Sequence, residues 1–138
     1  MANAKPVGLT ASAGYQIGVR RTLPITKEQA WDYLTSPEGL QSWLGDAPGI
    51  SFAAGERYRT AEGTTGEMRV VKPYEQIRMK CRFAQWEKES TLQIRIIPAG
   101  ERKTTVSFHQ ENLADGIVRE EMKRRWELVL DRLADSFQ

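Results

Sequence analysis

Few residues of this chain could do chemistry, and their positions keep them apart. The 138 residues include one cysteine, Cys81, and one histidine, His109. Apolar and polar residues alternate around both, which turns Cys81 toward an apolar face and His109 toward a solvated one. A cysteine nucleophile needs a base beside it, and no histidine shares the face of Cys81. We therefore expect an inert core thiol and a solvated or structural histidine.

The carboxylates are numerous but do not form an acid–base set. Glu67 in a predicted strand and Glu120 in a predicted helix both lie on faces that we expect to be wet. One cysteine and one histidine exclude an intrachain disulfide and are too few for a Cys/His zinc site. The sequence therefore favours a protein that is not an enzyme, and it predicts no metal and no cofactor.

Polar residues that point inward are the candidates for contacting a ligand. Alternation directs Tyr58, Thr60, Cys81 and Gln110 inward from their strands. Each of them could equally be a core group whose hydrogen bonds a neighbour satisfies. Arg119 lies in the apolar stripe of the last predicted helix, near its N-terminal end. Its guanidinium must either reach water or meet an anionic group at the mouth of a pocket.

The elements that position these residues follow from the spacing of apolar residues. Residues 15–23 alternate as a first strand would. Thr26 and Gln29 fit a capping box that begins a short helix. Ser36 followed by Pro37 fits the cap and first position of a second short helix.

Two-residue alternation returns between residues 49 and 113, in successive segments joined by turn residues, which predicts an antiparallel meander. Asp115 can cap a final amphipathic helix that reaches about Phe137. At about 1.5 Å per residue this helix is roughly 30 Å long, so it must lie across the apolar face of the sheet.

Together these elements predict an α+β fold. A curved antiparallel sheet of six to seven strands wraps around a long C-terminal helix, with two short helices after the first strand. We expect one domain over residues 14–138 and a flexible N-terminal tail over residues 1–13.

The charged residues predict an ordinary solvated surface. The formal charge is +2 and the basic residues are scattered, so we expect no nucleic-acid partner. The basic run 123–125 is interleaved with glutamates, and Glu121 has the spacing of a helix ion pair with Arg125. No run of about 18 apolar residues exists, so we expect no membrane span. The opening residues are too polar for a signal peptide, and we expect a cytoplasmic protein.

These residues, in this order, resemble the SRPBCC (START-like, helix-grip) superfamily. Within it the chain looks like the bacterial relatives of the activator of the ninety-kilodalton heat-shock protein's ATPase. The resemblance covers nearly everything from Tyr15 to Phe137. Its markers are Ala30-Trp31, Ser36-Pro37-Glu38-Gly39-Leu40, Trp43, Gly55, Tyr58, Gly66, Pro73, Phe108-His109, Trp126 and Leu130-Asp131-Arg132-Leu133.

The resemblance implies a cavity between the curled sheet and the long helix, although the same apolar faces would also make a solid core. Ligand pockets are mainly apolar with a few convergent polar groups. The inward positions of the strands and helices give the residues that would form the walls of the cavity: Leu34, Trp43, Tyr58, Met79, Cys81, Phe108, Met122 and Trp126. Arg119 would bind an anionic group of the ligand at the rim.

Three functions are consistent with this sequence. The first is non-catalytic binding of a small hydrophobic or amphipathic molecule inside that cavity. The second, which the resemblance implies, is a chaperone-associated interaction module. The third is an enzyme like the polyketide cyclases, which can work mainly by shaping a reactive chain and so need no catalytic triad. We rank them in this order because no catalytic set is present and the predicted interior is enclosed.

Overall fold

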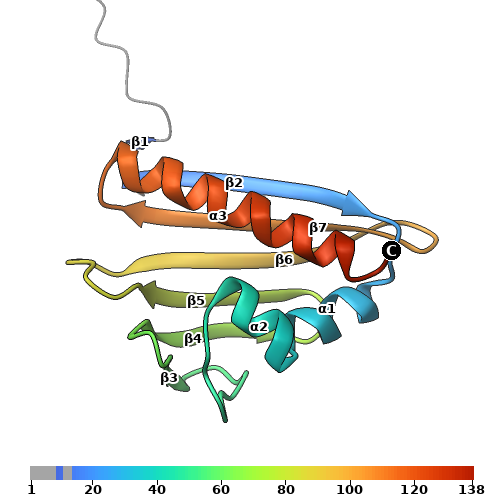
Figure 1. The fold of residues 1–138 in the computed structure, drawn as a ribbon, viewed down its shortest axis with the longest axis horizontal. Coiled ribbons are helices and arrows are strands. Elements are labelled where there is room, and N and C mark those ends of the chain that lie inside the picture. Colours follow the sequence, from blue (N-terminus) through green and yellow to red (C-terminus); the bar gives the residue numbers. More distant parts are fainter. Residues whose placement is uncertain (1–8, 11–13) are drawn as a thin grey trace, which may run out of the picture.

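A seven-stranded antiparallel sheet carries three helices on one face (Figure 1). The computed structural model describes residues 9–10 and 14–138. The strands are β1 (Leu9–Thr10), β2 (Gly14–Leu23), β3 (Arg57–Arg59), β4 (Thr65–Lys72), β5 (Gln76–Arg82), β6 (Ser90–Gly100) and β7 (Lys103–Leu113). The helices are α1 (Lys27–Thr35), α2 (Pro37–Trp43) and α3 (Gly116–Asp135).

The strand order is β1-β2-β7-β6-β5-β4-β3, and every neighbouring pair is antiparallel. The predicted meander is therefore confirmed from β3 to β7, and the first predicted strand returns to lie beside β7. The predicted tail over residues 1–13 falls mostly outside the described residues. Within that stretch, Leu9–Thr10 forms the short strand β1.

The two short helices begin where the sequence predicts. The Gln29 backbone N–H donates to Thr26 Oγ1 at 3.1 Å, and the Thr26 N–H donates to Gln29 Oε1 at 2.9 Å, which is the reciprocal capping box. The Ser36 hydroxyl oxygen caps α2 by accepting from the Gly39 N–H at 3.0 Å. A Cβ at position 39 would collide with the Tyr33 carbonyl, so only glycine allows α2 to start this close to α1.

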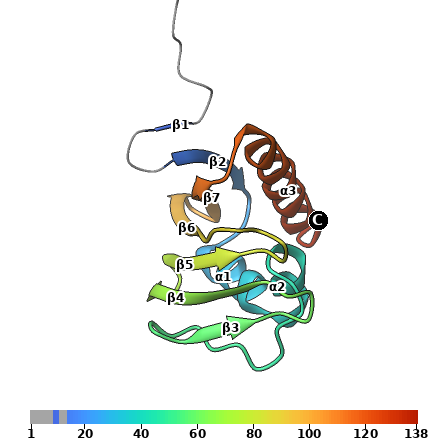
Figure 2. The same ribbon diagram turned by 90° about the vertical axis from the view of Figure 1, so that its left-hand side faces the viewer.

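Helix α3 lies across strands β2 and β7, as the two views of the fold show (Figure 2). Asp115 caps it by accepting from the Val118 N–H at 2.9 Å, as predicted. Its inner side is the apolar stripe Met122, Trp126, Val129, Leu130 and Leu133, all buried. The helix ends at Asp135, two residues before the predicted end, and the side chain of Phe137 beyond it is 37% exposed.

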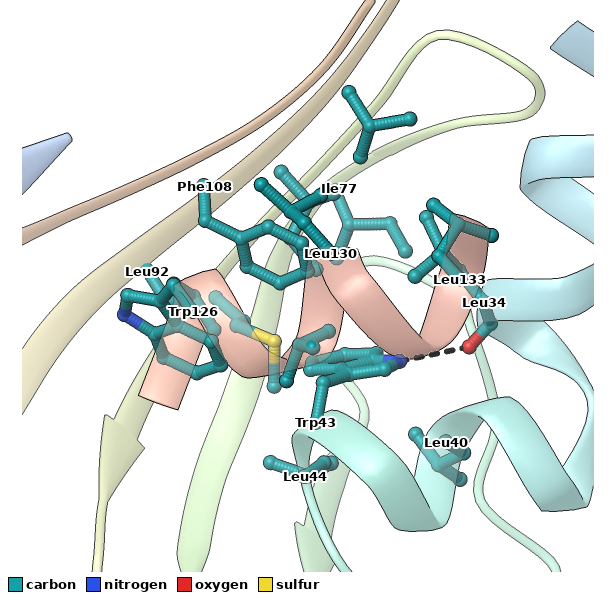
Figure 3. Packing of buried hydrophobic residues seen from close by; sticks show 14 of the residues in the cluster. Leu34, Leu40, Trp43, Leu44, Ile77, Leu92, Phe108, Trp126, Leu130 and Leu133 are labelled. Atoms are coloured by element: carbon teal, nitrogen blue, oxygen red, sulfur yellow. Dashed lines mark hydrogen bonds between the residues drawn. The ribbon is translucent and has the colours of Figure 1, made fainter. Parts of the chain in front are cut away.

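Three aromatic rings occupy the centre of the space between the sheet and the helices (Figure 3). The rings of Phe108 and Trp126 stack with centroids 4.8 Å apart, and Trp43 meets Phe108 edge-on at 6.4 Å. The Trp43 indole N–H donates to the Leu34 carbonyl at 2.8 Å, the dashed line in Figure 3. Because α2, α3 and β7 each contribute one ring, this cluster joins both helical parts to the sheet.

Trp126→Ala should lower the free energy of unfolding by about 3–5 kcal/mol, because it empties a fully buried aromatic site. Leu128→Ala is the matched control on the same helix, since Leu128 is 50% exposed and should cost under about 0.5 kcal/mol. Urea unfolding of both variants measures the difference. A loss below about 1 kcal/mol for Trp126→Ala would contradict the packing described here.

Candidate ligand site between the sheet and the last helix

The eight predicted wall residues lie in one buried cluster between the sheet and the helices. Tyr58 and Met122 are the most accessible of them, at 8% and 7% exposed. The other six are fully buried: Leu34, Trp43, Met79, Cys81, Phe108 and Trp126. They come from α1, α2, β3, β5, β7 and α3, so residues far apart in sequence meet here.

Arg119 lies apart from this cluster. Its Nε donates to the Gln16 carbonyl at 2.7 Å, and one terminal nitrogen contacts the Glu120 carboxylate at 2.7 Å. The side chain is 16% exposed. Donors of this guanidinium are therefore already bonded to a carbonyl of β2 and to a neighbouring carboxylate. An anionic ligand would have to compete with both acceptors.

A chain of polar side chains runs through the apolar interior. The Trp126 indole N–H donates to Gln110 Oε1 at 3.0 Å, and Gln110 Nε2 donates to Ser90 Oγ at 3.0 Å. The Ser90 hydroxyl then donates to the Cys81 carbonyl at 2.6 Å. The predicted inward direction of Gln110 is confirmed. Sequence reasoning missed Ser90, although extending the alternation back by two residues from Leu92 would have placed it on the same face.

Tyr58 and Cys81 are held in their neutral forms. The Tyr58 hydroxyl donates to the Lys80 carbonyl at 2.6 Å. Burial raises the pKa of this phenol well above its usual range, and burial likewise raises the pKa of the Cys81 thiol to about 11. The Tyr58 hydroxyl passes so close to Gly66 that a Cβ there would collide with it.

Arg125 is the charged residue that sequence reasoning missed. We predicted a solvated side chain paired with Glu121, and this is wrong. Its Nη2 donates instead to the carbonyl of Trp43, at the end of α2, at 2.9 Å. Its guanidinium carbon lies 4.4 Å from the centroid of the Phe83 ring and 5.5 Å from that of Trp126. Burial lowers the pKa of this group.

One donor of Arg125 is left without a partner. Among the side-chain nitrogen and oxygen atoms that are buried in the described residues, Arg125 Nε is the one without a hydrogen-bond partner. Such atoms are rare in folded proteins because each forfeits the hydrogen bond that water supplied.

Four hollows formed by the described residues have volumes from about 340 to about 530 Å³. Of the eight predicted wall residues, Tyr58 lines one of these four, a hollow of about 460 Å³ over β3, β4 and β5. His109 lies on the outer face of the sheet as predicted, with Nε2 3.0 Å from Gln16 Oε1.

The described residues contain no group of three or more His, Cys, Asp or Glu placed to hold a metal ion. Across the same residues, no helix has both the length and the apolar character needed to cross a membrane.

A sequence profile of the family described as Activator of Hsp90 ATPase homolog 1-like protein matches residues 24–138. No curated protein matches this sequence. The fold is similar to an HSP90 activator from Plasmodium falciparum, with a TM-score of 0.69 and 19% identity over 80% of this chain and 86% of that one.

Two further solved structures share the fold. The Aha1 dimer from Colwellia psychrerythraea has a TM-score of 0.71 and 18% identity over 88% of this chain and 94% of that one. DynU16, from the dynemicin biosynthetic locus, has a TM-score of 0.76 and 19% identity over 88% of this chain. The chain spans 46% of the length of DynU16. At these identities the likeness establishes the fold alone.

The buried thiol gives a prediction for stability against pH. Below pH 9 the Cys81 thiol is protonated in both the folded and the unfolded chain. Between its ordinary pKa of 9.0 and its folded pKa of about 11, the unfolded chain releases the proton and the folded chain keeps it. The free energy of unfolding should therefore fall more steeply from pH 9 to pH 11 in the parent than in Cys81→Ala. Urea melts across this range measure it, and parallel profiles would disprove it.

Proposed function

This chain belongs to the family of Activator of Hsp90 ATPase homolog 1-like proteins, and on that premise we propose that it binds a small hydrophobic or amphipathic molecule between the sheet and α3. The observation that carries the proposal is the make-up of this interior. It is packed with apolar side chains, and polar groups from α3, β5, β6 and β7 converge within it. Ligand sites are built in this way, with apolar area for affinity and a few polar groups for orientation.

The ligand enters between α3 and the turn that joins β5 to β6. Met122 is the slightly exposed member of the inner stripe of α3. Phe83 and Trp86 of the turn meet edge-on at 5.0 Å, and Phe83 covers Arg125. A surface turn can open at lower cost than the sheet or the helix. We infer that opening this turn admits the ligand and lets its apolar part take the place of packed side chains.

Binding is favoured over catalysis because two ionisable groups of the interior, the Tyr58 hydroxyl and the Cys81 thiol, are kept neutral. The Tyr58 hydroxyl donates a hydrogen bond to a backbone carbonyl. The Cys81 thiol is fully buried, and its raised pKa leaves almost no thiolate at pH 7. Neither group is poised to take or give a proton.

Met122→Arg should abolish binding of the uncharged probe N-phenyl-1-naphthylamine, because it places a charge in the apolar interior that the probe must enter. Ile117→Arg is the control, since it adds the same charge at a position on α3 that is 73% exposed. Fluorescence titration gives the dissociation constants, and circular dichroism checks folding. If folded Met122→Arg binds the probe as tightly as the parent, the ligand does not lie between the sheet and α3.

A second candidate function, a chaperone-associated module, is favoured by the similarity to the Plasmodium falciparum HSP90 activator. It predicts that this protein raises the ATPase rate of the bacterial homologue of that chaperone and enriches it in a pull-down. We expect neither effect from the ligand-binding protein proposed here. A reproducible stimulation would place the chaperone function first.

A further inference from the structure

We propose that Arg125 recognises the headgroup of the ligand, so that the preferred ligand is an apolar molecule with one anionic group. This inference rests on the proposed function and deepens it. It assigns the charged end of the ligand to the place where α3, the end of α2 and the β5–β6 turn meet.

The first argument is a positive charge with no carboxylate in contact. The guanidinium of Arg125 is half-buried and in contact with two aromatic rings. No carboxylate of the described chain lies within 4.0 Å of it. Glu62 is the nearby acid, and its carboxylate is exposed and accepts instead from the Asp46 N–H at 3.0 Å. Glu62 therefore attracts the guanidinium without contacting it, and an anion in direct contact would offset more of the cost of desolvation.

The second argument is the set of donors that remain. The Trp43 carbonyl accepts one hydrogen bond from Nη2, and the buried Nε makes none. A carboxylate binds arginine best through two parallel hydrogen bonds, one from Nε and one from a terminal nitrogen. Arg125 therefore keeps one donor that a second oxygen could accept from, once opening of the β5–β6 turn lets an anionic group approach its Nε edge.

The third argument is the orientation of the surroundings. Phe83 covers the guanidinium from one side, and the Trp126 ring is the second nearby aromatic surface. Ring faces attract and hold a guanidinium without using its in-plane donors. Met122 precedes Arg125 by three residues, so the two side chains are neighbours on α3. An apolar body beside Met122 would thus carry its anionic end to Arg125.

The sequence alone pointed to Arg119 for this role, and the contacts of the two arginines differ. Arg119 already donates from Nε to a backbone carbonyl and pairs with Glu120. Within the described residues, Arg125 has an Nε without a partner and no carboxylate within 4.0 Å of its guanidinium. Arg119→Gln is therefore a matched control for Arg125→Gln, with the same change on the same helix.

The test compares decanoate with decanol, which share a chain length and differ in charge. Displacement of N-phenyl-1-naphthylamine gives both affinities for the parent, Arg125→Gln, Arg125→Lys and Arg119→Gln. We expect the parent to bind decanoate at least tenfold more tightly than decanol. Arg125→Gln should lose about 10- to 100-fold for decanoate with decanol unchanged, the loss of one charge-assisted contact. Arg125→Lys should bind decanoate with an affinity between those of the parent and Arg125→Gln, because lysine keeps the charge but cannot donate two parallel hydrogen bonds.

The outcomes separate this inference from the function beneath it. Equal affinity of the parent for decanoate and decanol, or equal losses for both in Arg125→Gln, would overturn the role of Arg125 and leave ligand binding standing. Failure of the parent to bind either molecule would overturn the proposed function itself. If Arg125→Gln does not fold, the decanoate-to-decanol ratio of Arg125→Lys decides. Decyl sulfate and decyl phosphate then show whether the site prefers a carboxylate.

Discussion

Trp126 attaches helix α3 to the sheet through two different interactions. Its ring stacks on Phe108 of β7 at 4.8 Å, and its indole N–H donates to Gln110 of the same strand at 3.0 Å. The stack supplies buried area, and the hydrogen bond fixes the rotation of α3 about its axis. That rotation in turn decides where Met122 and Arg125 point. The enclosed interior and the charged end of the candidate site therefore both depend on this one residue.

The polar chain from Trp126 through Gln110 to Ser90 also constrains the sheet. Each of these groups is fully buried and would be costly without its partner. Shifting β7 by one residue against β6 would turn Gln110 to the outer face and leave the Trp126 and Ser90 groups unpaired. These hydrogen bonds thus couple the register of β6 and β7 to the position of α3. Apolar contacts alone would specify that register less sharply.

Most of the fold could be predicted because its signals are local. Thr26, Ser36 and Asp115 each cap a helix through the residue three positions later, and the inward direction of Gln110 follows from alternation alone. The end of α3 was placed too late because the apolar spacing continues to Phe137 beyond the last helical turn. Arg125 could not be found because its partners, Trp43 and Phe83, are brought to it only by the tertiary fold. A helical projection gives the angle of a side chain but not its neighbours.

Strand β3 forms one edge of the sheet and is only three residues long, with arginines at both ends. A short edge offers few free backbone groups to another chain, and two copies meeting there would bring like charges together. The sheet is thereby protected from continuing into a neighbouring molecule at this side. At high protein concentration, this edge of the folded sheet should resist the strand-to-strand stacking from which amyloid grows.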